Sequence, residues 1–129
     1  MITIENIQNA YATMQTDNDF PALVKALQSI NVKTFSFYVY NGSEIFIDIE
    51  NNQVHLPEKY KSKEISDTVD QDYFAQSLKA HQKRETDFST FLNDCAKSGV
   101  SYWVVDLLAK NCTYFDKKKE NVYQEDLPF

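Results

Sequence analysis

The sequence has little of what marks a secreted, membrane-spanning or nucleic-acid-binding protein. Two cysteines, Cys95 and Cys112, are too few for a disulfide framework. There is one arginine, and 13 basic residues against 19 acidic ones give a net charge of −6, whereas phosphate binding needs concentrated positive charge. No apolar run approaches the roughly 20 residues of a membrane span, and the first residues lack the features of a signal peptide. We therefore expect a cytoplasmic protein that binds neither nucleic acid nor membranes.

Glycine and proline are also scarce, with two and three residues, which disfavours a linker or a disordered chain. The length of 129 residues and the 43% of hydrophobic residues fit a single domain over residues 1–129. His55 and His81 are far apart, and neither has a second His, Cys or Asp at the spacing of one helical face. We expect no metal site and no cofactor.

Apolar spacing predicts two helices followed by three strands. Residues 3–16 show helical periodicity with Thr3 as cap, and a second helix begins near Pro21 and ends at Asn31. The period then changes to two over residues 35–40 and 45–49, with Asn41-Gly42 as a tight turn, and a short strand follows around residues 54–56.

The same order of elements recurs when the chain is shifted by 68 positions. Asp19-Phe20 then falls on Asp87-Phe88, and Asn31 falls on Gly99, where a helix end favours a left-handed residue. Few matched residues are identical, so the pattern carries the prediction. We predict repeats over about residues 3–57 and 68–126, with a charged joint at about 58–67. The predicted fold class is α+β: two helix–helix–strand–strand–strand repeats about a pseudo-two-fold axis, with helices on one face of a mainly antiparallel sheet.

The second repeat carries a resemblance to a known family. The run Thr86-Asp87-Phe88-Ser89-Thr90-Phe91, a helix, Gly99-Val100, an aromatic residue and Asp106 resembles an uncharacterised bacterial family of proteins of similar length. That family is catalogued as domain of unknown function 1398 and is often labelled "phage envelope protein". The family more often has Gly before Thr-Asp-Phe, where this chain has Arg84-Glu85. The resemblance covers nearly the whole chain and implies no mechanism for these residues.

Two groupings could carry catalysis, and each has a structural alternative. Cys95 could be a nucleophile with His81 as base and Asp87 as orienting group, but its helical spacing with Phe88, Phe91 and Leu92 favours a core position. Asp48 and Asp116 recur at equivalent positions and could act as an acid–base pair. Both precede turns, however, where Asp commonly binds backbone N–H groups. We therefore assign no catalytic residue.

The second face of the sheet is the candidate site. We expect the helices to cover the side that bears the following residues: Phe35, Phe37, Val39, Ile45, Ile47, Trp103, Val105 and Phe115. Alternation then places an apolar set on the other side: Tyr38, Tyr40, Phe46, Val104, Leu108 and Tyr114, accompanied by Glu44, Asp48 and Asp106. Monomers rarely expose a patch of this kind.

This face predicts a non-enzymatic binding or protein-interaction module. Its predicted ligand or partner residues are Tyr38, Tyr40, Phe46, Asp106 and Tyr114, and a second copy in a homodimer, another protein or a small ligand could cover them. The alternative is a small hydrolase or transferase that acts on a small ligand through Asp106, Asp48 or Asp116 with Tyr groups.

Overall fold

The computed structural model describes residues 1–16 and 19–128, and its elements follow the predicted order. The first repeat consists of α1 (Ile4–Tyr11), α2 (Phe20–Ser29), β1 (Val32–Tyr38), β2 (Glu44–Asp48) and β3 (Gln53–Leu56). The second consists of α3 (Gln71–Gln82), α4 (Phe88–Lys97), β4 (Tyr102–Asp106), β5 (Asn111–Phe115) and β6 (Asn121–Asp126).

Helix α1 begins where the sequence predicts and ends earlier. Thr3 caps it, because its hydroxyl accepts a hydrogen bond from the Asn6 N–H while the Asn6 side chain accepts one from the Thr3 N–H. The expected helix ran to residue 16. Instead, the Thr13 N–H bonds to the Ala10 carbonyl and the Thr13 hydroxyl bonds to the same oxygen at 2.7 Å, which tightens the last turn and ends the helix.

The strands of the described residues form one sheet in the order β3-β2-β1-β4-β5-β6, with every neighbouring pair antiparallel. The central pair joins the repeats. Ser36 pairs with Val104, its equivalent at the shift of 68, so the pseudo-two-fold axis passes between these two residues. The hydrogen bonds obey the same symmetry, because Val39 N–H bonds to Ser101 O and the equivalent Leu107 N–H bonds to Lys33 O. The predicted pseudo-two-fold arrangement is confirmed.

Equivalent turns repeat the same backbone geometry. Asn31 and Gly99 both have positive φ, at 65° and 86°, as the helix ends predicted. At Gly99 a Cβ would also lie 2.9 Å from the Thr68 carbonyl oxygen, so a side chain there would clash with backbone. Asn51 and Lys119, again 68 positions apart, have φ of 67° and 66°.

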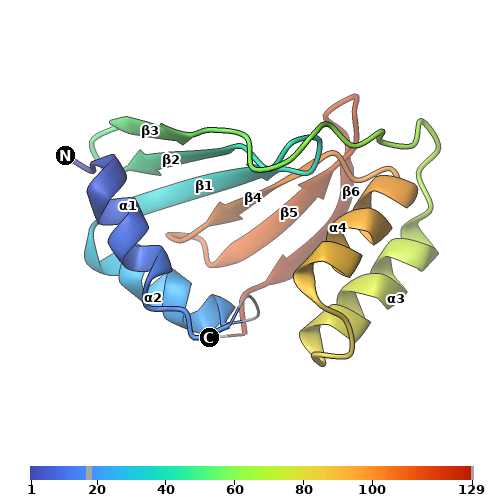
Figure 1. Ribbon diagram of the computed structural model, residues 1–129, viewed down its shortest axis with the longest axis horizontal. Coiled ribbons are helices and arrows are strands. Elements are labelled where there is room, and N and C mark those ends of the chain that lie inside the picture. The colour runs from blue at the N-terminus through green and yellow to red at the C-terminus, as the bar shows by residue number, and fades with distance from the viewer. Residues whose placement is uncertain (17–18, 129) are drawn as a thin grey trace.

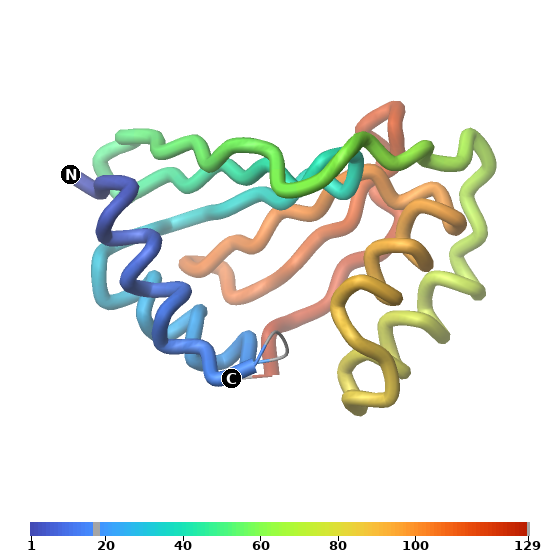
Figure 2. Tube along the Cα trace, in the orientation of Figure 1, coloured from blue at the N-terminus to red at the C-terminus, as the bar shows by residue number. Residues whose placement is uncertain are grey.

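Each helix pair covers one half of the same sheet face. Figure 1 shows α1 and α2 on the left and α3 and α4 on the right, with β4 and β5 visible between them. In Figure 2 the segment after β3 runs along the β3 side of the molecule from the first repeat to α3. Backbone hydrogen bonds fasten this segment at Lys59 and Lys63 to the β1–β2 turn and at Ser66 to Ala96 of α4.

The strand register corrects the predicted faces. Phe35 pairs with Phe46, and Trp103 pairs with Tyr114, so each of these pairs shares one face. Phe46 and Tyr114 are 0% and 6% exposed and lie under the helices, not on the opposite side as predicted. Glu44 and Asp48 are buried on that same helix-covered face. Ile45, Ile47 and Phe115 lie on the opposite side, although the sequence pattern put them beneath the helices. A hairpin slip of one residue reverses every side chain of a strand, and the alternation within single strands does not reveal it.

Candidate functional site

The face away from the helices carries three rows of side chains that follow from the strand pairing. We call it the open face and define it by nine partly exposed residues: Thr34, Ser36, Tyr38, Ile45, Ile47, Tyr102, Val104, Thr113 and Phe115. Its middle row crosses the sheet through Ile45, Ser36, Val104 and Thr113. No helix packs on these residues in the described part of the chain, since the ring contacts of the helices all lead to the other face.

An aromatic row forms one side of the open face. The rings of Tyr38 and Tyr102 stack with centroids 5.4 Å apart, and those of Tyr102 and Phe115 stack at 4.9 Å. Partial burial, followed by the effects of Tyr38 and Asp116, raises the pKa of Tyr102. The ring therefore stays neutral, and its hydroxyl keeps a proton to donate. Three stacked rings on neighbouring strands make a rigid apolar surface with polar ends.

The predicted site residues divide between the two faces and the turns. Tyr38 and Asp106 belong to the open side of the sheet, as predicted. Tyr40 lies beyond the paired part of β1 and is 53% exposed. Phe46 and Tyr114 are core residues. The rings of Phe35 and Phe46 stack at 5.4 Å, and Tyr114 lies 4.8 Å from the ring of Phe74 on α3.

Sequence reasoning missed four large members of the open face: Ile45, Ile47, Tyr102 and Phe115. The repeat held a signal for two of them. Ile45 and Tyr102 correspond to Thr113 and Thr34, so each of these positions is polar in one copy, whereas the core position of Phe46 and Tyr114 is aromatic in both. Ile47 and Phe115 correspond to one another and carry no such signal.

The three aspartates considered for acid–base chemistry are committed to turns. Asp106 accepts hydrogen bonds from the Leu108 and Ala109 N–H groups at 3.0 and 2.9 Å. Oδ1 of Asp48 accepts from the N–H groups of residues 50 and 52, and Oδ1 of Asp116 accepts from the equivalent residues 118 and 120. Burial alone would raise the pKa of Asp48, but hydrogen bonds from Asn52, Ile2 and Glu50 outweigh it and lower that pKa. The turn-capping interpretation is confirmed.

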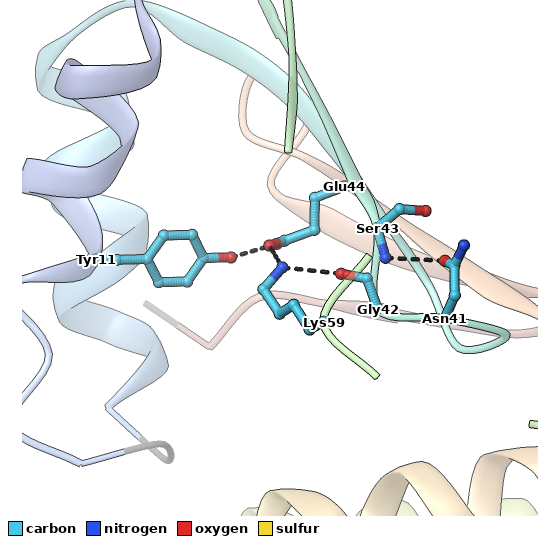
Figure 3. A network of polar contacts seen from close by, with 6 residues as sticks. All are labelled: Tyr11, Asn41, Gly42, Ser43, Glu44 and Lys59. Carbon is cyan, nitrogen blue, oxygen red and sulfur yellow. Dashed lines mark hydrogen bonds and ion pairs between the residues drawn. The ribbon is translucent and has the colours of Figure 1, made fainter. Parts of the chain in front are cut away.

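A buried carboxylate joins three separate segments on the helix-covered side. Glu44 of β2 is 1% exposed, accepts a hydrogen bond from the Tyr11 hydroxyl of α1 and pairs with the Lys59 ammonium (Figure 3). Lys59 also donates to the Gly42 carbonyl at 2.8 Å and lies 5.7 Å from the centroid of Phe37. Burial, reinforced by the neighbouring carboxylate, strongly raises the pKa of Tyr11. Both oxygens of Glu44 are occupied, so this group fastens α1 and the 57–70 segment to the sheet.

The thiols are unsuited to nucleophilic chemistry. Cys95 is 0% exposed, and burial raises its pKa well above the usual range. Burial likewise raises the pKa of Cys112 to about 12. His81 stacks on Phe91 at 4.6 Å, and its Nδ1 lies 3.2 Å from the Thr86 carbonyl oxygen. The Asp87 side chain accepts a hydrogen bond from the Thr90 N–H at 2.8 Å and caps α4. The core interpretation of Cys95 is confirmed, and His81 is a partly buried neighbour of that core.

Two surface hollows lie away from the open face. One, of about 480 Å³, is bordered by the 57–70 segment and α4, including Lys63, Asn93 and Lys97. The other, of about 380 Å³, lies against the β5–β6 turn at Asp116 and Lys117. Lys117 pairs with Asp67 at 2.7 Å at the rim of this hollow. Most of the residues that line the two hollows are charged or polar surface residues, unlike the apolar and aromatic lining of typical small-molecule pockets.

Within residues 1–16 and 19–128, no group of three or more His, Cys, Asp or Glu side chains is placed to hold a metal ion. Over the same residues, no helix has the length and apolar character to cross a membrane.

Comparison with curated proteins gave no match. Comparison with family models gave one over residues 8–126, which is nearly the whole chain. The expected resemblance is thereby confirmed, and the chain belongs to the family described as "Protein of unknown function (DUF1398)".

Proposed function

We propose that the protein is a non-enzymatic interaction module that binds another protein through its open face. The stacked row of Tyr38, Tyr102 and Phe115 is the observation that carries this proposal. Aromatic side chains are enriched at the centres of protein interfaces, because they bury a large area at a small cost in conformational entropy.

The chemistry of the remaining groups supports binding over catalysis. The carboxylates that a small hydrolase or transferase would use hold turns or a buried cluster, as Asp48, Asp106, Asp116 and Glu44 do. An acid–base pair needs two carboxylates that converge on one substrate, whereas Asp48, Asp106 and Asp116 belong to three different turns of the sheet. The open face, in contrast, offers stacked rings and aliphatic groups, which suit a macromolecular surface.

A photo-reactive amino acid placed at Val104 tests the proposal. Val104 lies at the centre of the open face, whereas the control position, Ser89, is an exposed residue of α4. On irradiation in cells of the source organism, we expect a few discrete protein adducts from position 104 and none of these from position 89. Changing Tyr102 to Ser in the same chain should abolish them. Adducts that are absent, or equal at both positions, would overturn the proposal.

A further inference from the structure

We infer that the partner of the open face is a second copy of this chain, packed face to face in a two-fold symmetric dimer. The inference rests on the proposed function and names its partner. It follows from the pseudo-symmetry of the sheet, the distribution of charge on the open face and the area available there.

The pseudo-two-fold axis emerges at the centre of the open face, between Ser36 and Val104. Both halves of the sheet therefore present the same backbone surface around one point. A two-fold dimer requires a patch that fits itself, because the same residues meet from both copies. Two such faces can be centred on one another so that each outer strand lies over an outer strand of the other copy, as in β-sandwiches, whose two sheets pack about 10 Å apart.

Charge is absent from the centre of this face and accumulates elsewhere. The paired residues of the middle row and of the aromatic row include no Asp, Glu, Lys or Arg. The chain nevertheless has a net charge of −6, so association through any acidic region would be repulsive. Contact through the open face keeps the like charges of two copies away from the centre of the interface.

The third row of the sheet favours one orientation. It contains Ile47 and Thr34 in the first repeat, Asp106 on β4 and, on the edge strand β6, Asp126, which pairs with Asn111. A two-fold axis perpendicular to the strands places this third row of one copy over the aromatic row of the other. Asp106 then faces the hydroxyl end of Tyr102, which is a hydrogen-bond donor. An axis parallel to the strands would instead set β4 over β1 of the other copy, so that Asp106 faces Thr34 and loses the Tyr102 hydroxyl as a partner.

The area is sufficient for a reversible dimer. Strands about 4.8 Å apart and about five residues long give the six-stranded face a flat extent of roughly 29 by 17 Å, or about 500 Å² before side-chain relief is counted. Standard interfaces bury roughly 600–1,000 Å² of accessible surface per partner. Full face-to-face packing reaches the lower part of this range, where weak and reversible associations are found, so we expect a micromolar Kd rather than a permanent dimer.

Opposite charges at the centre test the dimer directly. In the proposed orientation, Val104 of one copy lies against Val104 of the other. Val104→Glu and Val104→Lys, each alone, should weaken self-association by about 30-fold or more, because a central apolar contact becomes a pair of like charges. An equimolar mixture of the two variants should regain association. Sedimentation equilibrium from about 1 to 200 μM, a range around the expected micromolar Kd, measures both effects.

Matched controls separate surface effects from folding. Ser89→Glu and Ser89→Lys, on exposed α4, should associate like the wild type, alone or mixed. Circular dichroism melts show whether the Val104 variants fold. If they do not, Ser36→Glu and Ser36→Lys, one strand away across the axis, provide the same test.

The outcomes distinguish this inference from the proposed function. A wild type that stays monomeric to 200 μM, or a mixture that fails to regain association, overturns the second-copy inference. Position 104 adducts of another mass would then leave the interaction module standing, with a different protein as partner. A monomeric wild type without adducts overturns both.

Discussion

Phe46 provides the sharpest test of the strand register, because the residues on either side of it lie on the opposite face. Its side chain is 0% exposed, stacks on Phe35 at 5.4 Å and meets the edge of Tyr11 at 6.3 Å. Ile45 and Ile47 are partly exposed on the open face. Replacing Phe46 by Ala should therefore remove core contacts, and replacing either isoleucine should not.

The expected magnitudes are well separated. Truncation of a fully buried Phe costs about 3–5 kcal/mol, because the lost transfer free energy is joined by the cost of a cavity. Ile47→Ala removes contacts only from a partly solvent-exposed surface and should lower the free energy of unfolding by about 1 kcal/mol or less. With an m value of about 1.5 kcal/mol/M, a loss of 4 kcal/mol lowers the urea midpoint by nearly 3 M.

Urea unfolding followed by circular dichroism, at a protein concentration where the chain is monomeric, measures the difference. Phe46→Leu serves as a milder variant if Phe46→Ala does not fold, and it should lose stability in the same direction. An Ile47→Ala chain that loses as much stability as Phe46→Ala would refute the register and the assignment of the open face.

Three further predictions concern buried polar groups. Lys59→Ala should lower the free energy of unfolding, measured in urea, by about 3 kcal/mol, because it leaves the 1% exposed Glu44 carboxylate without its cation. Glu44→Gln should lower it less, because the half-exposed Lys59 ammonium can be solvated by water. The second concerns pH. Burial lowers the pKa of His81 below its usual 6.5, so below about pH 6.5 the unfolded state binds more protons at this residue, and the stability of the wild type should fall as the pH drops. His81→Leu should flatten this part of the stability–pH curve, and an unchanged curve would contradict the burial of the ring. Third, Cys95→Ala should lower the free energy of unfolding by about 1–3 kcal/mol through lost packing. Both thiols should react with an aromatic disulfide reagent only as fast as the chain unfolds, and rapid labelling of the native protein would refute a structural role.

The sequence allowed the order of elements and the repeat to be predicted because these depend on local signals. Capping by Thr3 and Asp87 and the left-handed positions Asn31 and Gly99 act within a few residues of the backbone they control. In the structure the shift of 68 maps the bounds of α2, Phe20–Ser29, onto those of α4, Phe88–Lys97. Local signals of this kind can be recognised in the sequence without any knowledge of the tertiary structure.

The faces of the strands could not be predicted in the same way, because register is a relation between strands. In β2 the outward residues Ile45 and Ile47 are more apolar than the inward residues Glu44, Phe46 and Asp48. Two acidic side chains are buried there, Glu44 with Lys59 and Asp48 with backbone N–H groups. Hydrophobicity alone therefore selects the wrong face, and only the partners of the two carboxylates explain the observed one.

Comparison of the repeats separates what the fold requires from what is particular to one half. Asp48 and Asp116 are retained at equivalent turns and make the same backbone hydrogen bonds, so the turn needs them. Glu44 corresponds to Cys112, and both are buried; the position therefore tolerates an apolar group, and the ion pair with Lys59 is an addition of the first repeat. Burying an ion pair that the fold does not need still costs desolvation free energy, which its hydrogen bonds must offset.

On the open face it is the second repeat that has the particular feature, because its Tyr102 and Phe115 correspond to Thr34 and Ile47 of the first repeat. The stacked row across β1, β4 and β5 therefore has no counterpart in the symmetry-related row of Ile47, Thr34 and Asp106, and the core does not require it, which supports the proposed interaction.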